Sequence, residues 1–377
     1  MTHEDNDDED LEVDYRRRSA QLSLLGEEDV EDVDPLDEQE IINFTYDITS
    51  YGVDFVVDGL VQRLDRNDIQ VPPFQRDYVW NKTQADRFVE SLLLGLPVPG
   101  IFLSREEETN KLLVIDGQQR LRTLQAFYAG RWMDDEEFRL DSVRTRFRDA
   151  TYAALAPDDK RRLDDSILHA TVIKQDQPSE DQSSVFFIFE RLNSGGTQLE
   201  PQEIRAAIYQ GEFNDLLARL NDESAWRAIY GKKSPRLKDQ ELILRYLAML
   251  ERHDSYLRPM KEFLNAFMAT KRHLSPEDAE RYALSFTETI QIVHDVLGRQ
   301  AFKPRTSLSA AVFDAVMVGL THRLASGPIT DREQVRHVYD QLLGDNRFVD
   351  ATIRSTADQE RVRLRIKQAV EAFSAVP

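Results

Sequence analysis

The chain has 377 residues, of which 41% are apolar, and a formal net charge of −20. This apolar content is enough for one large or two ordinary globular domains, which excludes a protein disordered throughout. The absence of cysteine excludes disulfides, thiol nucleophiles and cysteine-ligated metal centres. No apolar run reaches the length of a transmembrane helix, and the first residues lack a secretory signal. We therefore expect a cytoplasmic protein with no membrane partner.

The negative charge is concentrated at the start of the chain. Residues 1–40 contain 17 acidic and three basic residues, a net charge of −14, which leaves −6 for residues 41–377. Because like charges repel and few apolar residues are available for burial, residues 1–40 are predicted to be a disordered acidic tail. The alternative is that the acidic segment attracts a basic partner or imitates a nucleic-acid backbone.

The first predicted elements alternate between helix and strand. Helical periodicity indicates helices from about Asp54 to Leu64 and from Lys82 to Leu94, with a proline-rich extended run over residues 69–80 between them. Two short apolar stretches, Gly100–Leu103 and Lys111–Ile115, are predicted to be paired strands joined by a hairpin loop.

Helices dominate the rest of the chain. The predicted elements are a helix from Gly117 to Gly130, a strand over Ile167–Ile173, helices over 182–192 and 201–209, and only helices from Asp239 onward. We therefore predict an α+β protein. An N-terminal domain with a small mixed sheet spans residues 41–210, and an all-helical half spans residues 211–377.

The strongest local signal is the sequence Asp116-Gly117-Gln118-Gln119-Arg120 (DGQQR) between a predicted strand and a predicted helix. A strand that turns through glycine into a helix points backbone N–H groups outward, which favours an anion. Arg120 can add a bidentate contact to a phosphate. Gln118 and Gln119 can donate to phosphate oxygens or orient a water molecule, and Asp116 can hold magnesium or that water. The alternative is an Asp-Gly turn that only reverses the chain.

Two further segments are candidates for the same site. Gln75 and Arg76 lie on extended backbone just before a helix, from which the guanidinium can reach the same phosphate. A surface arginine beside packing aromatics is the alternative there. The second segment is a glycine loop after a helix, with candidate nucleotide-binding residues Arg191, Asn193, Gly195 and Gly196. Its alternative is a helix–loop–helix corner that needs glycine for backbone reasons alone.

Other catalytic signatures are missing from the sequence. It has no P-loop, no Gly-x-Gly-x-x-Gly after a strand and no His-Glu-x-x-His. The seven histidines are scattered singly, so a histidine-centred metal nuclease is not expected. His169, in an apolar strand, is predicted to be a satisfied interior residue.

Three motifs together resemble the N-terminal domain of GmrSD-type modification-dependent restriction enzymes. They are Phe74–Trp80, Ile115–Leu121 and Phe189–Gly196. The resemblance implies a ParB/sulfiredoxin-like fold in which a Gly-x-x-Arg turn at a helix start binds nucleotide phosphates. By this resemblance Gly117 to Arg120 would hold the phosphates, Gln75 and Arg76 would flank them, and Asp116 would serve a metal ion or the attacking water.

The same resemblance implies a function. It indicates a nucleotide-binding and NTP-hydrolysing anti-phage defence protein of the restriction type, with GTP or ATP and Mg²⁺ as cofactors. Full-length relatives carry an HNH-like nuclease module, whereas residues 211–377 show only helical pattern and isolated histidines. We therefore expect modified phage DNA to be cut by a separate nuclease subunit.

Two alternatives remain open at this point. One is a non-catalytic DNA-recognition subunit that recruits a partner nuclease, and the other is a ParB-like core that nicks DNA itself with a metal. The basic clusters that would support DNA recognition are Arg139, Arg144, Arg146 and Arg148; Lys232, Lys233, Arg236 and Lys238; and Arg361, Arg363 and Arg365. The net charge of −6 after residue 40 argues against a broad footprint on phosphates.

Overall fold

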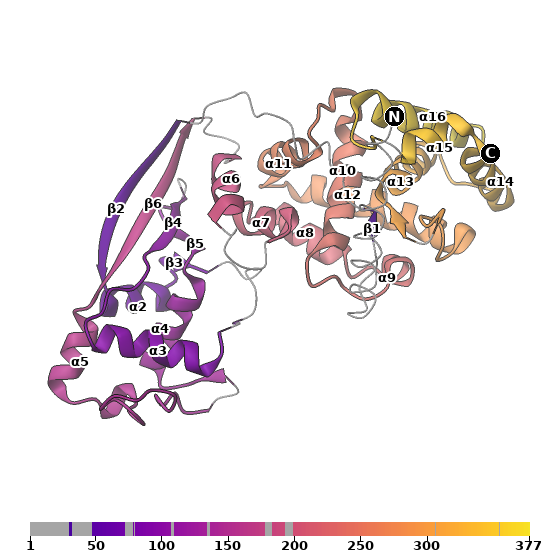
Figure 1. Ribbon diagram of the computed structural model, residues 1–377. Helices are drawn as coiled ribbons and strands as arrows, with labels where there is room; N and C mark the ends of the chain where they lie inside the picture. The colour runs from indigo at the N-terminus through magenta and orange to yellow at the C-terminus, as the bar shows by residue number, and fades with distance from the viewer. Residues whose placement is uncertain are drawn as a thin grey trace, which may run out of the picture. The chain divides into compact units, whose positions relative to one another are not determined.

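The computed structural model describes residues 30–31, 47–71, 78, 80–106, 109–133, 136–177, 183–192, 199–305, 307–353 and 355–377. They divide into two units (Figure 1). The sheet unit consists of the described residues of Phe44–Leu199 with Ala206–Ile208, and the helical unit contains Glu200–Arg205 and Tyr209–Pro377. No helix in the described ranges has the length and apolar character needed to span a membrane.

The predicted acidic tail, residues 1–40, lies outside the described residues except for two of them. Val30–Glu31 form strand β1, which pairs in parallel with β7 (Leu308–Ser309) of the helical unit. The prediction for the remainder of the tail stays a prediction.

A five-stranded mixed sheet, in the order β2-β6-β4-β5-β3, is the framework of the sheet unit. The strands are β2 (Asp47–Val56), β3 (Ile69–Gln70), β4 (Ile101–Arg105), β5 (Leu112–Asp116) and β6 (Ile167–Gln177). β2 is antiparallel to β6 and β4 is antiparallel to β5, whereas β4 and β6, and β3 and β5, are parallel. The predicted hairpin and the predicted third strand are confirmed.

The start of the sheet unit differs from the prediction. Asp54–Val56, predicted as the first turn of a helix, is the end of β2, and helix α2 begins only at Val57 (Val57–Asp65). Leu60, Val61 and Leu64 are buried on α2, as the periodicity predicts. The three preceding residues pair with β6 instead, because a ten-residue antiparallel ladder outweighs a local helical pattern.

Three more helices complete the core of the sheet unit. They are α3 (Lys82–Leu93), α4 (Gln118–Ala129) and α5 (Pro157–Asp164). α3 begins with a capping box in which Asn81 and Gln84 each accept a backbone N–H of the other at 3.0 Å. Leu103 and Val114 of the sheet are fully buried in one cluster with Leu121 of α4. Helix α6 (Ser183–Leu192) packs against β5 and β6.

The second half was predicted to be all helical, and its described residues are helical except for the two-residue strand β7 and the connecting segments. Its helices are α7 (Pro201–Ile208, in part), α8 (Glu212–Leu220), α9 (Ser224–Tyr230), α10 (Lys238–Arg252), α11 (Met260–Lys271), α12 (Pro276–Ile292), α13 (Ala310–Leu324), α14 (Arg332–Gly344), α15 (Asn346–Ile353) and α16 (Gln359–Ser374). α13 is buried from Ala311 to Leu320. α16 crosses it closely at Gly319, where a Cβ would lie 2.9 Å from the backbone of Ala369.

Charged side chains are buried in the middle of the helical unit. Asp314 of α13 is fully buried and accepts hydrogen bonds from Arg245 Nη2 at 2.7 Å and from Arg365 Nη2 at 3.4 Å. Burial lowers the pKa of the Arg365 guanidinium to about 10, which leaves it charged at neutral pH. One buried carboxylate therefore neutralises part of the charge of two buried guanidiniums.

Candidate nucleotide-phosphate site

Asp116, Gly117 and Gln118 take the chain from β5 directly into α4 with no intervening loop. Gly117 has a φ of 101°, in the left-handed region. A Cβ at this position would lie 2.3 Å from Cγ2 of Ile101 and 2.8 Å from its Cβ. Both the backbone conformation and the available space therefore require glycine. The predicted strand–turn–helix is confirmed at this point.

The start of α4 has the electrostatic character of an anion site. Gly117 is the N-cap residue and supplies no side-chain hydrogen bond to the first turn, which contains no acidic residue. The first backbone N–H groups of a helix carry a partial positive charge that attracts anions. The predicted preference of the turn for phosphate itself stays a prediction.

The structure brings Arg120 and Asp116 together. Nη2 of Arg120 donates to Oδ2 of Asp116 over 2.6 Å, and the two side chains are 13% and 43% exposed. Asp116 is the last residue of β5 and Arg120 lies in the first turn of α4, so the pair spans the glycine turn. The predicted phosphate ligand is thus held at the turn by the predicted metal ligand.

Gln118 and Gln119 are positioned by the residues around them. Gln118 is only 8% exposed. Oε1 of Gln119 accepts the backbone N–H of Trp80 at 3.2 Å, and its carbonyl oxygen accepts a hydrogen bond from Thr123 at 2.6 Å. The hydroxyl of Tyr78 is 2.6 Å from that of Thr123, and burial raises the pKa of Tyr78 to about 12. Gln119 therefore ties α4 to the segment around residues 78–80.

The structure describes only one of the other predicted site residues, Arg191. Gln75, Arg76, Asn193, Gly195 and Gly196 lie outside the described residues, so their roles stay predictions. Arg191 is exposed in the last turn of α6. Within the described ranges, no hydrogen bond or ion pair joins Arg191 to Asp116 or Arg120.

The prediction for His169 is wrong. Its side chain is 60% exposed, and Nδ1 lies 2.8 Å from Oδ1 of Asp54, the residue opposite it on β2. Alternate residues of β6 point to opposite faces of the sheet, and Leu168 and Ala170 occupy the buried one. In the part of the chain that the structure describes, no three acidic or histidine side chains gather as metal ligands.

One cation near the turn was not among the predicted residues. Arg122 lies one turn after Gln118 on α4, and its Nε is buried without a hydrogen-bond partner. The spacing of four residues from Gln118 is the sequence signal that could have identified it, because such residues share a helix face.

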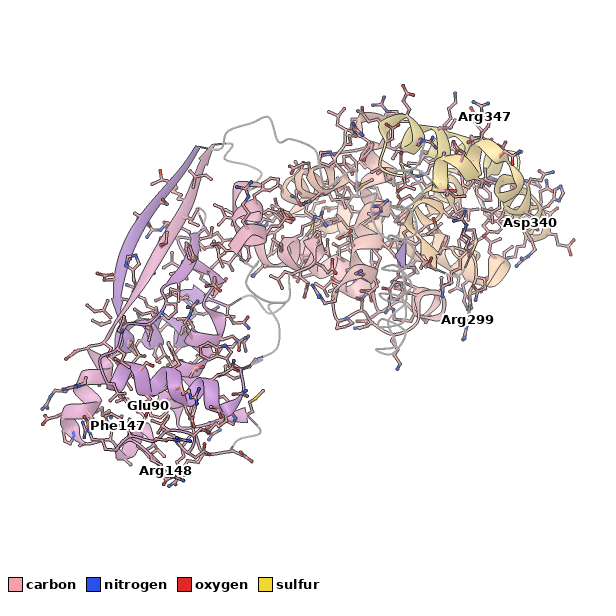
Figure 2. All side chains as sticks on the ribbon, viewed as in Figure 1. Glu90, Phe147, Arg148, Arg299, Asp340 and Arg347 are labelled. Carbon is pink, nitrogen blue, oxygen red and sulfur yellow. The ribbon has the colours of Figure 1, made fainter. Side chains whose placement is uncertain are left out.

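The basic clusters considered for DNA recognition are largely neutralised by carboxylates. In the sheet unit, Arg148 projects outward beside Asp149 (Figure 2), at a distance of 3.9 Å. The other ion pairs of the first and third clusters are Arg139 with Glu137, Arg146 with Asp159, Arg361 with Asp350, and Arg365 with Asp314. Among the described residues, exposed Arg144 has no ion pair.

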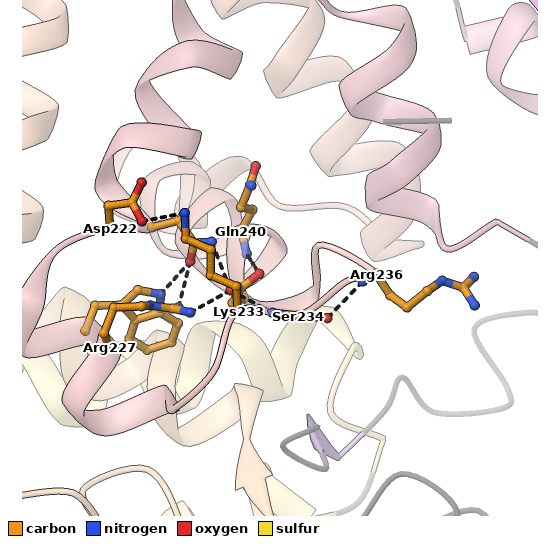
Figure 3. A network of polar contacts seen from close by, with 9 residues as sticks. Asp222, Arg227, Lys233, Ser234, Arg236 and Gln240 are labelled. Carbon is orange, nitrogen blue, oxygen red and sulfur yellow. Dashed lines mark hydrogen bonds and ion pairs between the residues drawn. The ribbon is translucent and has the colours of Figure 1, made fainter. Parts of the chain in front are cut away.

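The second basic cluster belongs to a structural network between α9 and α10 (Figure 3). Lys233 pairs with Asp222. Nε of Arg236 donates to Glu203 of α7 at 2.8 Å. In the same network, buried Asp239 accepts from Arg227 at 3.0 Å and from the backbone N–H of Ser234 at 3.2 Å. These contacts hold the loop between the two helices, so the cluster does not offer a row of unpaired cations to a DNA backbone.

A comparison with known families gives a match that includes the turn. Residues 57–210 match the family model described as the N-terminal domain of the GmrSD restriction endonuclease. The matched range contains the Asp116–Arg120 turn and most of the sheet. A comparison with curated proteins finds no match. Residues 57–210 are therefore similar to the N-terminal domain of the GmrSD restriction endonuclease, as the three motifs predict.

Proposed function

We propose that the sheet unit binds and hydrolyses a nucleoside triphosphate, GTP or ATP, and that the chain acts in restriction-type defence against phage. The observation that carries this proposal is the Gly117 turn, which starts α4 without a side-chain cap and places Arg120 beside it. A turn of this kind inside a domain of the restriction family is best used to hold the phosphates of a nucleotide.

In this proposal the protein acts mainly by electrostatic stabilisation. Backbone N–H groups of the first turn of α4 hold phosphate oxygens, and Arg120 neutralises the charge that develops during phosphoryl transfer. Because Arg120 is bonded to Asp116, it must exchange this carboxylate for a phosphate. Asp116 is then available to orient the attacking water. Gln118 and Gln119 support the turn, and Gln75 and Arg76 are proposed to flank the phosphates.

Magnesium is proposed to accompany the nucleotide. Mg²⁺ is commonly bound by one or two carboxylates together with substrate phosphates and water. Asp116, 43% exposed at the turn, is the carboxylate that fits this requirement once Arg120 has moved to a phosphate. The ion would neutralise charge on the phosphate oxygens.

Modified phage DNA and a separate nuclease subunit are the proposed partners. The pairing of the basic clusters with carboxylates disfavours a wide, sequence-independent contact with DNA phosphates. A gel-shift series across salt concentrations, with modified and unmodified duplexes, tests this point. Tight binding of every duplex with a steep salt dependence would contradict it.

The hydrolytic activity is tested with a panel of ATP, GTP, CTP and UTP, with Mg²⁺ and with or without DNA. We expect release of phosphate from at least one nucleotide by the wild-type chain, and loss of this release on Arg120→Ala. Equal activity in the wild type and the variant would overturn the proposal. A supercoiled plasmid in the same reactions tests for nicking, which we expect to be absent.

A further inference from the structure

Strand β2 is the outermost strand of the sheet unit (Figure 1). Among the described strands it pairs only with β6, through a ladder that covers its ten residues. An edge strand of this length offers a row of unpaired N–H and C=O groups, which native proteins commonly block with proline, lysine or a bulge. β2 contains no proline, lysine or arginine, and its one irregularity lies at the first step, between Asp47 and Ile48.

The hydrogen bonds to β6 show which residues of β2 face the other edge. The backbone N–H of Val57 donates to the carbonyl oxygen of Ser166 at 2.9 Å, one step after the pair of Val56 with Ile167. In an antiparallel ladder, residues that direct their backbone groups at the partner alternate with residues that direct them away. The residues of β2 with backbone groups directed away from β6 are therefore Ile48, Ser50, Gly52 and Asp54.

Apolar side chains are exposed along the same strand. Tyr51 is 37% exposed and Val56 is 49% exposed, and Ile167, opposite Val56 on β6, is 60% exposed. Aromatic and β-branched residues are the types that gain most from a neighbour on an adjacent strand. Both the backbone and the side chains of β2 are therefore suited to the addition of a further strand.

A second copy of β2 fits this edge in the antiparallel orientation. When Gly52 of one copy lies opposite Gly52 of the other, the backbone groups directed away from β6 in the two copies meet and can exchange hydrogen bonds. Ser50 of each copy then lies opposite Asp54 of the other, so a hydroxyl faces a carboxylate and no carboxylate faces another. The same register makes the contact symmetric, as a two-fold axis requires.

The apolar residues of β2 also match in this register. Ile48 of one copy lies opposite Val56 of the other, and Tyr51 lies opposite Val53. The first pair lies on the face of the sheet that carries Ile167, because Ile167 is opposite Val56 on β6. Each exposed apolar side chain of β2 therefore gains an apolar neighbour.

We infer that two copies of the chain associate edge to edge through β2, which joins their two five-stranded sheets. Backbone hydrogen bonds provide affinity in such a strand addition, and the side chains determine the register. The contact does not involve the Gly117 turn, because β6 and β4 lie between β2 and β5 in the sheet. The inference is therefore independent of the proposed nucleotide.

The first test is the mass of the full chain in solution without nucleotide. Light scattering after size exclusion and sedimentation velocity, over a range of concentrations, should show a dimer that dissociates on dilution. Ser50→Pro removes an N–H directed away from β6, and Tyr51→Lys places a charge at the centre of the contact. Each should weaken association at least tenfold. Leu284→Lys, on an exposed leucine of α12, is the control and should dimerise as the wild type does.

The second test is the register, and the absence of cysteine makes it clean. Tyr51 and Val53 of opposite copies form a pair without mutual backbone hydrogen bonds, in which the Cα atoms are about 4.5 Å apart. This distance suits a disulfide. A mixture of Tyr51→Cys and Val53→Cys chains should form a linked dimer under mild oxidation. Leu257→Cys, on an exposed leucine of the helical unit, should not.

Several outcomes would overturn the inference. A wild type that is monomeric at every concentration would leave the β2 edge to a strand of a different protein. Dimers as tight as the wild type in both Ser50→Pro and Tyr51→Lys would place the contact elsewhere. Should Ser50→Pro fail to fold by circular dichroism, wild-type association of Tyr51→Lys alone would be decisive. Linkage of the mixed chains no faster than that of Leu257→Cys would overturn the register.

Discussion

Arg120 and Asp116 face each other across the Gly117 turn, with Nη2 of the arginine 2.6 Å from Oδ2 of the aspartate. In this pair the two charges neutralise each other, whereas the proposed reaction needs Arg120 at the phosphate and Asp116 at the water or Mg²⁺. In the proposed function, a polyphosphate must therefore compete with the Asp116 carboxylate for the Arg120 guanidinium. The first two predictions concern this competition.

Replacing Arg120 with alanine should reduce nucleotide affinity or turnover at least tenfold. A charge-assisted bidentate contact to phosphate is lost, while the surrounding core remains. Steady-state hydrolysis and circular dichroism measure the two effects. The matched control is Arg87→Ala on α3, an exposed arginine away from the turn, which should behave as the wild type.

Replacing Asp116 with asparagine should have opposite effects on binding and hydrolysis. Without the carboxylate, Arg120 no longer needs to exchange partners, so triphosphate measured without Mg²⁺ should bind severalfold more tightly. Hydrolysis should fall, because the group proposed to orient water and to hold Mg²⁺ has lost its charge. Weaker binding of triphosphate by this variant would show that Asp116 does not compete with the phosphate.

Gly117→Ala should destabilise the sheet unit more than Gly130→Ala does. Both glycines have left-handed backbone, which costs an L-residue about 1–2 kcal/mol. At Gly130 a Cβ meets nothing within 4 Å, whereas at Gly117 it would lie 2.3 Å from Ile101. Overpacking adds about 1–3 kcal/mol at Gly117. Denaturant unfolding of the two variants measures this difference, and equal losses would contradict the geometry of the turn.

Asp314→Asn should be strongly destabilising. The substitution leaves the buried guanidiniums of Arg245 and Arg365 without an anionic partner, which costs about 3–5 kcal/mol. Asp350→Asn is the control, since its pair with Arg361 is exposed and such pairs contribute about 0–1 kcal/mol. Thermal unfolding of the helical unit compares the two, and a small effect at Asp314 would show that the cluster relaxes.

His322 should make stability depend on pH. Burial lowers its pKa below the usual 6.5, and the nearby ring of His253 lowers it further, whereas Asp254 opposes the shift. The folded state then binds fewer protons than the unfolded state below pH 6.5, so the free energy of unfolding falls as the pH falls. Uptake of one full proton would change the free energy of unfolding by about 1.4 kcal/mol per pH unit. The change for His322 should be smaller, because solvent screens a partly exposed ring.

Unfolding by urea at several values between pH 5 and 7.5 measures this contribution. His322→Gln should flatten the dependence relative to the wild type. His337→Gln, on an exposed histidine of α14, should leave it unchanged. Parallel curves for the wild type and His322→Gln would contradict the prediction.

Local sequence was sufficient for the turn and for most helices. Gly117 and Gly130 lie at the two ends of α4, and both take the left-handed conformation that other residues avoid. The positions of these glycines in the sequence therefore predict the boundaries of the helix. The motif around Asp116 was recognisable from the same short stretch of chain, because the glycine and the start of the helix that follows it are local features.

Long-range pairing was decided only by the tertiary structure. Asp54–Val56 carries a helical pattern but forms strand because β6, more than a hundred residues later, provides a ladder. The same ladder exposes His169, since its register determines which face each residue occupies. In the sequence, the three basic clusters are candidates for a DNA-binding surface. In the structure, carboxylates neutralise most of these basic residues. Among the described residues, Arg120 pairs with Asp116 whereas Nε of Arg122 is buried without a hydrogen-bond partner, because the fold determines which opposite charges come within reach.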